Sequence, residues 1–262
     1  MSARRRLPLA VSALAAVGLL FVAVPIVALL IRVPWSDLGS LFGSNVVTDA
    51  LRLSLIASVL ATLTAALLGI PLAIALARGT FRGKSIVRGF VLLPLVLPPV
   101  VGGAALLFAL GRRGVIGEPL ESLTGVVLPF SLWGVVVAVT FVAMPFVVIT
   151  TEAALRGLGG RHEAAAATLG ASRSTVLRRV TLPMIAPSIL AGLVLTWARA
   201  LGEFGATITF AGNLGGRTQT LPLAVFVALE QDRDAAVAIS LVMVIISLAV
   251  LIGLRDRWWG SW

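Results

Sequence analysis

Hydrophobic residues gather along this chain in long runs, and the short segments between the runs carry most of the charged residues. A helix needs about 20 consecutive apolar residues to cross a bilayer. Six runs reach that length, at residues 9–31, 53–77, 89–110, 125–150, 184–210 and 235–254. The pattern therefore predicts an all-α polytopic membrane protein with six transmembrane helices.

The first run follows Arg4, Arg5 and Arg6, as the apolar part of a secretory signal would. It is longer than the roughly 7–15 apolar residues typical of a signal peptide, and five further runs follow it. An uncleaved membrane anchor is therefore the better interpretation.

Composition supports the membrane assignment and argues against an enzyme. Of the 262 residues 59% are hydrophobic and 12% are charged, more apolar surface than a soluble domain of this length can bury. There is no cysteine and a single histidine, His162, and no Gly-x-Ser-x-Gly motif or pair of carboxylates lies within the runs. Gly83-Lys84-Ser85 resembles a phosphate-binding loop, but three residues separate it from Gly79 where the motif needs four. We expect no catalysis, no metal and no cofactor in this chain.

The positive charges lie unevenly on the two sides of the predicted membrane. The amino terminus, the loop after the second run, the loop after the fourth run and the carboxyl tail hold three, four, five and two basic residues. The opposite side holds six. Because the basic side is normally cytoplasmic, both termini and the loop 151–183 are predicted to face the cytoplasm. The net charge of +10 is then explained by the basic residues that orient the spans in the membrane, and nucleic acid is not expected as a partner.

The loop 151–183 carries helix start and stop signals of its own. Gly159 and Gly160 end the extension of the fourth run, and a short helix is predicted over 163–169 with Glu163 in its first turn. Gly170 is suited to the left-handed conformation that ends a helix. Ser172 can cap a second helix over 173–182, and Pro183 marks the next boundary.

A helix this short is stable only when it packs against something. A membrane-surface linker would carry large apolar anchors, and this helix offers only Leu169. Docking of a small, smooth helix into a groove of another protein is therefore the favoured hypothesis.

Each group of polar residues or prolines within the runs has two interpretations, one structural and one in a transport pathway. Arg199 and Glu203 are four apart, hence on one face of a helix, and we expect them to pair with each other or with groups on other helices, either as a structural brace or as part of a pathway. Ser54 and Ser58 begin a hydroxyl stripe, although alanines on the same helix favour close helix packing instead. Three prolines interrupt the third run, either as a gate or as a tolerated kink. The predicted pathway or gate residues are Ser54, Ser58, Pro98, Pro99, Arg199, Glu203 and Thr207.

The stretch from Glu163 to Pro183, EAAAATLGASRSTVLRRVTLP, resembles the EAA loop of ABC-importer permeases. That pattern is Glu-Ala-Ala, three residues, Gly, nine residues and Ile-x-Leu-Pro. Counted from Gly170, the second half matches with Val180 in place of Ile, whereas the acid stands one residue early, at Glu163 instead of 164. The resemblance implies a coupling helix that sits in a cleft of an ATPase subunit. The residues it assigns to this contact are Glu163, Ala164, Ala165, Gly170, Ala171, Leu182 and Pro183.

Two further stretches narrow the resemblance within that superfamily. ARALGEFGATITFAGNLGGRTQTLPLAVF at 198–226 is similar to the molybdate permeases, and LPLVLPPVVGG at 93–103 resembles the oxyanion branch as a whole. Sulfate permeases share the Gly-Glu-Phe-Gly core, and the TITF that follows it favours molybdate. The similarity covers about 48–254, which gives an importer domain there, an amino-terminal segment over 1–47 with the first span, and a cytoplasmic tail over 255–262.

The resemblance implies a homodimer in a bacterial or archaeal cell membrane, with two ATPase subunits that bind ATP-Mg and an extracytoplasmic oxyanion-binding protein. Tungstate is an additional substrate under this hypothesis. Sulfate or thiosulfate import is the main alternative. An ion-coupled secondary transporter is a further one, which the single intramembrane acid and the lack of an obvious repeat disfavour.

Overall fold

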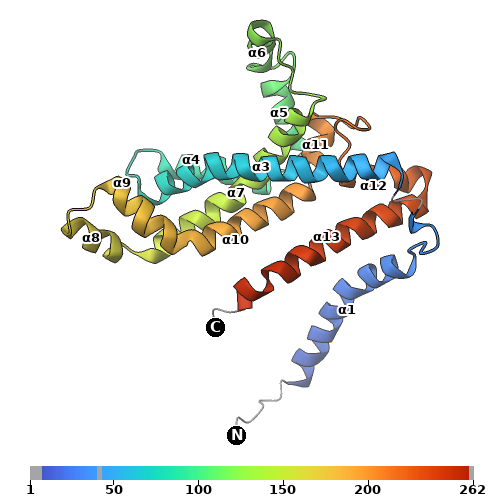
Figure 1. The fold of residues 1–262 in the computed structure, drawn as a ribbon, viewed down its shortest axis with the longest axis horizontal. Helices are drawn as coiled ribbons and strands as arrows, with labels where there is room; N and C mark the ends of the chain where they lie inside the picture. Colours follow the sequence, from blue (N-terminus) through green and yellow to red (C-terminus); the bar gives the residue numbers. More distant parts are fainter. Residues whose placement is uncertain (1–7, 40–42, 260–262) are drawn as a thin grey trace. The chain divides into compact units, whose positions relative to one another are not determined.

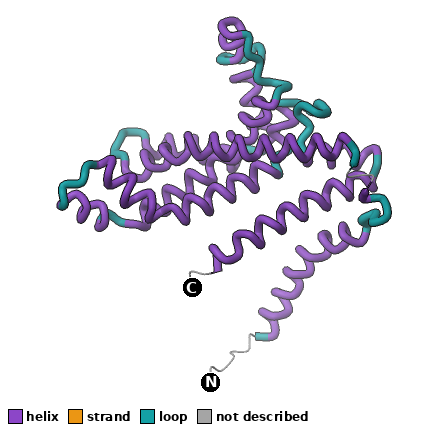
Figure 2. Tube along the Cα trace, viewed as in Figure 1, coloured by secondary structure: helices purple, strands orange, loops and turns teal. Residues whose placement is uncertain are grey.

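The computed structural model describes residues 8–39 and 43–259, with side chains described as far as residue 253. Arg4, Arg5 and Arg6, and the side chains of the predicted tail 255–262, lie outside the described residues. Within these ranges the chain is helix and loop without a strand, so the all-α prediction is confirmed there (Figure 2). The elements are α1 (Leu9–Ile31), α3 (Asn45–Arg78), α4 (Lys84–Val96), α5 (Pro99–Leu110), α6 (Gly117–Thr124), α7 (Leu132–Leu158), α8 (Arg161–Thr168), α9 (Arg173–Val176), the π-helix η1 (Leu177–Thr181), α10 (Leu182–Leu201), α11 (Gly205–Phe210), α12 (Leu221–Gln231) and α13 (Arg233–Trp259) (Figure 1).

Five stretches of the described chain are long and apolar enough to cross a bilayer. They correspond to the first, second, fourth, fifth and sixth predicted runs. Their bounds are Leu9–Ile31, Asn45–Arg78, Leu132–Leu158, Arg173–Leu201 and Arg233–Gly253.

The third predicted span is not one helix, which corrects the expectation for 89–110. It consists of α4 and α5, and Leu97 and Pro98 between them are extended, with ψ of 136° and 132°. Each of these two residues precedes a proline, and the ring of that proline disfavours the helical conformation for the residue before it. Pro99 then starts α5, because the first helical position needs no N–H donor. Pro94, by contrast, lies inside α4 and does not break it.

The fifth predicted span, 184–210, is also divided. Its main helix ends at Leu201, and α11 begins at Gly205. Glu203 accounts for the new start, because its Oε1 accepts a hydrogen bond of 2.8 Å from the N–H of Ala206. A carboxylate on a free N–H at a helix start is a stabilising cap.

The chain divides into two compact units, Thr48–Leu223 and the combination of Met1–Val47 with Ala224–Trp262. The first unit is built around α7, which has valines and alanines buried along most of its length. Alanines of α3 pack on it: Ala57 and Ala61 lie in one cluster with Val135 and Val139. Small side chains let these two backbones approach closely, so that packing rather than a water-filled gap occupies this face of α3.

A close contact also joins α5 to α11. A Cβ built on Gly103 would lie 2.7 Å from Cβ of Thr209 and 2.8 Å from the backbone oxygen of Ala206. Any larger residue at 103 would therefore force the two helices apart. This contact keeps the segment that follows Glu203 against the helix that follows the Pro98–Pro99 break.

The second unit contains α1 and α13. No residue of α1 is buried, and its apolar side chains are exposed on all sides, as expected for a helix that faces lipid. At the start of α13, the side chain of Asp232 accepts hydrogen bonds from the N–H groups of Asp234 and Ala235, at 3.0 and 3.1 Å. The chain therefore turns into its last predicted span at a capped helix start.

Candidate functional site: the α8 segment and the polar residues of the helices

The segment around α8 is ended by glycines, as predicted. The preceding α7 stops at Leu158, followed by Gly159 with a φ of +64°. Beyond α8, Gly170 has a φ of +82°, its N–H donates to the carbonyl of Ala167, and the N–H of Ala171 donates to that of Ala166. This pair of hydrogen bonds is the Schellman arrangement, which needs a residue in the left-handed region. The predicted role of Gly170 as the helix stop is therefore confirmed.

The second predicted helix starts where the sequence indicated but does not end there. Ser172 caps it, because its hydroxyl accepts a hydrogen bond of 3.2 Å from the N–H of Thr175. The helical stretch then continues through Leu182 and Pro183 to Leu201, which corrects the expected boundary at Pro183. The wider π turn of η1 includes Arg179, the residue four positions before Pro183, whose carbonyl the proline ring would crowd in a regular α-helix.

Glu163 points back into the chain and holds α8 in place. Its Oε1 accepts hydrogen bonds from Nη2 of Arg78 and from Oγ1 of Thr181, both at 2.9 Å. Arg78 is the last residue of α3, and Thr181 is the last residue of η1. One carboxylate thus fixes the orientation of a helix too short to be stable alone. Sequence reasoning missed both partners, although Arg78 directly follows the second run.

Apart from Arg161 at its start, the outward face of α8 carries small side chains. Glu163 and Ala166 are half-buried, whereas Ala164, Ala165 and Thr168 are exposed. At 100° per residue, these three exposed positions lie opposite the half-buried pair. The one-residue offset of the acid therefore turns Glu163 inward and two alanines outward.

The other residues assigned to the ATPase contact differ in exposure. Ala171 and Leu182 are half-buried, and Gly170 and Pro183 are exposed. Their contact with an ATPase remains a prediction.

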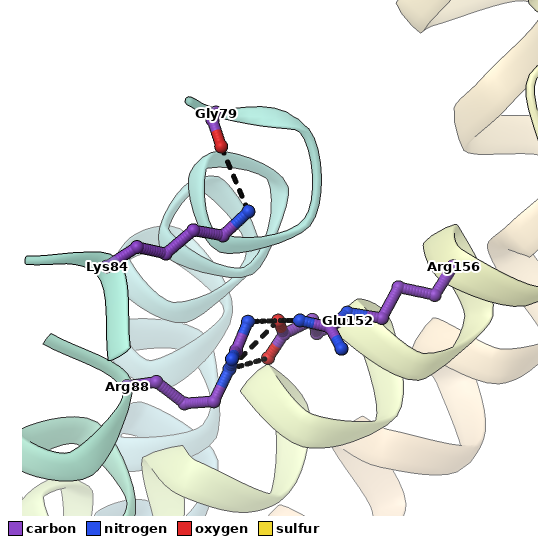
Figure 3. A network of polar contacts seen from close by, with 5 residues as sticks. All are labelled: Gly79, Lys84, Arg88, Glu152 and Arg156. Carbon is purple, nitrogen blue, oxygen red and sulfur yellow. Dashed lines mark hydrogen bonds and ion pairs between the residues drawn. The ribbon is translucent and has the colours of Figure 1, made fainter. Parts of the chain in front are cut away.

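A second carboxylate, Glu152, ties α4 to α7 close to the α8 segment. Figure 3 shows Arg88 from α4 and Arg156 from α7 converging on it. Nε of Arg88 lies 3.2 Å from Oε1 of Glu152, and Nη2 of Arg156 lies 2.7 Å from the same oxygen. Nearby, Nζ of Lys84 donates to the carbonyl of Gly79 at 2.9 Å, which closes the turn before α4 (Figure 3). The only sequence signal for this network was an acid four residues before Arg156.

Substitution of Glu152 with alanine is expected to destabilise the protein by about 2 kcal/mol. A fully buried pair broken on one side loses about 3–5 kcal/mol, and the loss here is smaller because Arg88 and Arg156 are partly exposed. The measurement is the apparent Tm of the purified protein, followed by tryptophan fluorescence. Glu121→Ala is the control, because its 3.7 Å pair with Arg112 is exposed and its loss should have little effect. Equal shifts for the two variants would contradict the structural role of Glu152.

Arg199 and Glu203 form the predicted pair, with Nη1 and Oε2 2.6 Å apart. Glu203 is only 2% exposed, and its other oxygen caps α11 through Ala206. Both oxygens are therefore engaged inside the chain, which favours the structural brace. A pathway role for the pair remains a prediction.

The serines of the hydroxyl stripe are buried and hydrogen-bonded to backbone. Oγ of Ser54 accepts a bond of 2.7 Å from the N–H of Leu221, and Oγ of Ser58 donates to the carbonyl of Leu55 at 3.1 Å. Ser54 thus holds the start of α12 against α3. The structure supports the close-packing interpretation at these positions, and their pathway role remains a prediction.

The remaining predicted gate residues lie on either side of the α5–α11 contact. Pro98 and Pro99 are exposed at the break before α5. Thr207 of α11 is fully buried, and its hydroxyl has no hydrogen-bond partner among the described residues. The structure brings the start of α11, which carries Thr207, close to the prolines. A Cβ at Gly205, the first residue of α11, would lie 2.8 Å from Cβ of Pro99.

The described chain thus combines membrane-length helices with a short helix that is held by partly exposed polar contacts of Glu163, an arrangement that suits a membrane transport subunit. The family of binding-protein-dependent transport system inner membrane components matches residues 69–258, and the chain belongs to this family. The resemblance to ABC-importer permeases that the EAA-like loop indicated is therefore confirmed.

Comparison with individual relatives shows which branch of the family this chain is most similar to among those compared. The molybdenum transport system permease protein ModB of Mycobacterium tuberculosis is 47% identical over 240 residues, which cover 92% of this chain and 90% of that protein. The sulfate transport system permease protein CysT of Salmonella typhimurium is 34% identical over 225 residues, covering 86% and 81%. The similarity to molybdate permeases deduced from the motifs is thus confirmed. The sequence identity to the sulfate permease is lower than the identity to the molybdenum permease.

A solved structure shows the same fold. A bacterial ABC transporter involved in the import of the acidic polysaccharide alginate superposes with a TM-score of 0.77 at 20% identity, covering 95% of this chain and 93% of the other.

Proposed function

We propose that this chain is the membrane permease of an ABC importer that carries molybdate, and tungstate with it, into the cytoplasm. The observation that carries the proposal is the 47% identity over nearly the whole of both chains with a molybdenum permease, against 34% with a sulfate permease. Transport is driven by ATP-Mg on separate ATPase subunits, and this chain performs no covalent chemistry.

The partners follow from the family and from the number of α8 helices. The family is defined as binding-protein-dependent, which supports an extracytoplasmic protein that delivers the oxyanion. One chain supplies one α8. Two ATPase subunits that work as a pair need two such helices, one for each subunit. The complete transporter is therefore a homodimer of this chain with two ATPase subunits.

The proposed topology has six crossings of the cell membrane and both termini in the cytoplasm. The sixth crossing comes from α4 and α5 together, which span residues 84–110 in spite of the break at Leu97 and Pro98. The basic segments next to α8 support a cytoplasmic position for that helix. The domain bounds 1–47, 48–254 and 255–262 remain predictions.

The contacts of Glu163 suggest how α8 transmits motion. A displacement of α8 by an ATPase pulls on Arg78 and Thr181, hence on α3 and on the helical stretch that leads into α10. These helices belong to one tightly packed unit, which responds by moving between discrete arrangements rather than by bending. Alternation between inward- and outward-open states would follow from such a movement.

Sulfate or thiosulfate import is the second candidate, favoured by the similarity to CysT and by the shared Gly202–Gly205 core. Membership of a binding-protein-dependent family speaks against an ion-coupled secondary transporter.

Labelled molybdate uptake in a strain that lacks this gene separates the two candidates. We expect that restoring the gene restores uptake, and that a hundredfold excess of unlabelled sulfate leaves this uptake unchanged. Strong suppression by sulfate would move the assignment to a sulfate or general oxyanion permease.

A further inference from the structure

A cavity of about 770 Å³ lies at the amino-terminal end of α3. Its charged lining comes from three separate segments of one compact unit: Asp49 and Arg52 from α3, Arg112 from the loop after α5, and Arg217 from the loop before α12. Three guanidinium groups against one carboxylate leave an excess of positive charge in the cavity.

Two of these arginines have no internal counter-ion. Among the described residues, Arg52 and Arg217 form no ion pair, whereas Arg112 makes only a long contact of 3.7 Å with Glu121. Both guanidinium groups therefore keep their donors for a ligand. A guanidinium presents its N–H groups in a planar fork that matches the oxygens of a carboxylate or an inorganic oxyanion.

The wall of the cavity is held in a specific shape. Phe130, which lines it, is the one non-glycine residue of the described chain with a positive φ, +58°. Gly212 makes room for this conformation, because a Cβ there would lie 2.7 Å from the Phe130 ring. Strained backbone of this kind persists where the surrounding structure requires it and is concentrated at functional sites.

The cavity and α8 lie at opposite ends of α3. Arg52 lies about two turns into this helix, and Arg78, which holds Glu163, is its last residue. The 26 intervening steps correspond to about 39 Å at 1.5 Å per residue, more than the roughly 30 Å of a bilayer core. Figure 1 shows α8 at one end of α3 and the start of α3 at the other.

We propose that this cavity is an extracytoplasmic subsite that binds the tetrahedral oxyanion dianion during its entry, with Arg52 and Arg217 as its principal ligands. The proposal rests on the proposed function, which places α8 in the cytoplasm. The excess of positive charge suits a dianion such as molybdate or sulfate. Arginines from two segments can contact its oxygens from different sides.

Equilibrium dialysis of labelled molybdate and labelled sulfate against the purified permease–ATPase complex, without binding protein, tests this subsite. In 50 mM NaCl we expect saturable binding of one or both dianions to the wild type. The double variant Arg52→Gln/Arg217→Gln should weaken it at least about tenfold, because two charge-assisted contacts are lost. Raising NaCl to 300 mM should weaken wild-type binding as well. Arg113→Gln is the matched control, since Arg113 is an exposed neighbour that does not line the cavity, and its effect should stay within about twofold.

The affinity of the complex for its binding protein separates this proposal from a docking surface. We expect the double variant to leave that affinity within about twofold. A loss of docking without a loss of dianion binding would show that the cavity receives acidic side chains of the binding protein and would overturn the proposal. Absence of dianion binding to the wild type, or equal weakening by Arg113→Gln, would overturn it too. Because wild-type molybdate uptake is measured separately, uptake without such binding refutes the subsite and leaves the proposed function standing.

Discussion

Tryptophan in place of Ala165 is expected to abolish molybdate uptake while the protein remains in the membrane. Ala165 is exposed on the outward face of α8 and contributes nothing to the fixed inward face. A side chain of that size prevents the helix from entering a groove shaped for alanine. If docking weakens by about 3 kcal/mol, the affinity for the ATPase falls more than about a hundredfold.

The measurements are labelled uptake, the amount of protein in isolated membranes and copurification of the ATPase subunit. Ala75→Trp is the matched control, because Ala75 is another exposed alanine, near the end of α3, and its replacement should leave copurification intact. Normal uptake by Ala165→Trp, with the ATPase still bound, would mean that α8 is not the docking helix.

Alanine in place of Glu203 is expected to destabilise the protein by about 3 kcal/mol and to reduce sharply the amount found in the membrane. The substitution leaves Arg199 without its partner inside a span and removes the cap of α11. An unpaired charge left behind in such an environment costs several kcal/mol. Apparent Tm and the protein level in membranes report the loss.

The double variant Arg199→Leu/Glu203→Gln distinguishes a structural role of the ion pair from a role in the transport pathway. It removes both charges and keeps an acceptor for the N–H of Ala206, so we expect stability and uptake to return to near wild-type levels. A stable double variant with uptake reduced more than about tenfold would instead show that the charges act on the anion. A Glu203→Ala protein as abundant and as stable as the wild type would contradict the role of Glu203 as a structural brace.

Local signals in the sequence predicted the α8 segment well. Gly159, Gly170 and Ser172 each act through their own backbone conformation or a hydrogen bond three residues away, and all three behave as expected. The pairing of Arg199 with Glu203 was predictable for the same reason, since four residues along a helix bring two side chains together.

Features that depend on distant segments of the chain were not predictable in this way. Glu163 binds Arg78 across 85 positions of sequence, and Ser54 binds Leu221 across 167, and no periodicity in one helix indicates which other helix lies beside it. The break in the third span is a different case. The consecutive prolines at 98 and 99 favour extended residues before each of them, but a count of apolar residues does not register that constraint.

ATP-driven import can be tested with the purified permease reconstituted in liposomes together with its ATPase and binding protein. We expect that molybdate accumulates inside only when ATP-Mg is available to the ATPase and the binding protein is outside, and that a proton ionophore leaves the uptake unchanged. Molybdate uptake that proceeds without ATP and stops when the proton gradient collapses would contradict the assignment as an ABC-importer permease.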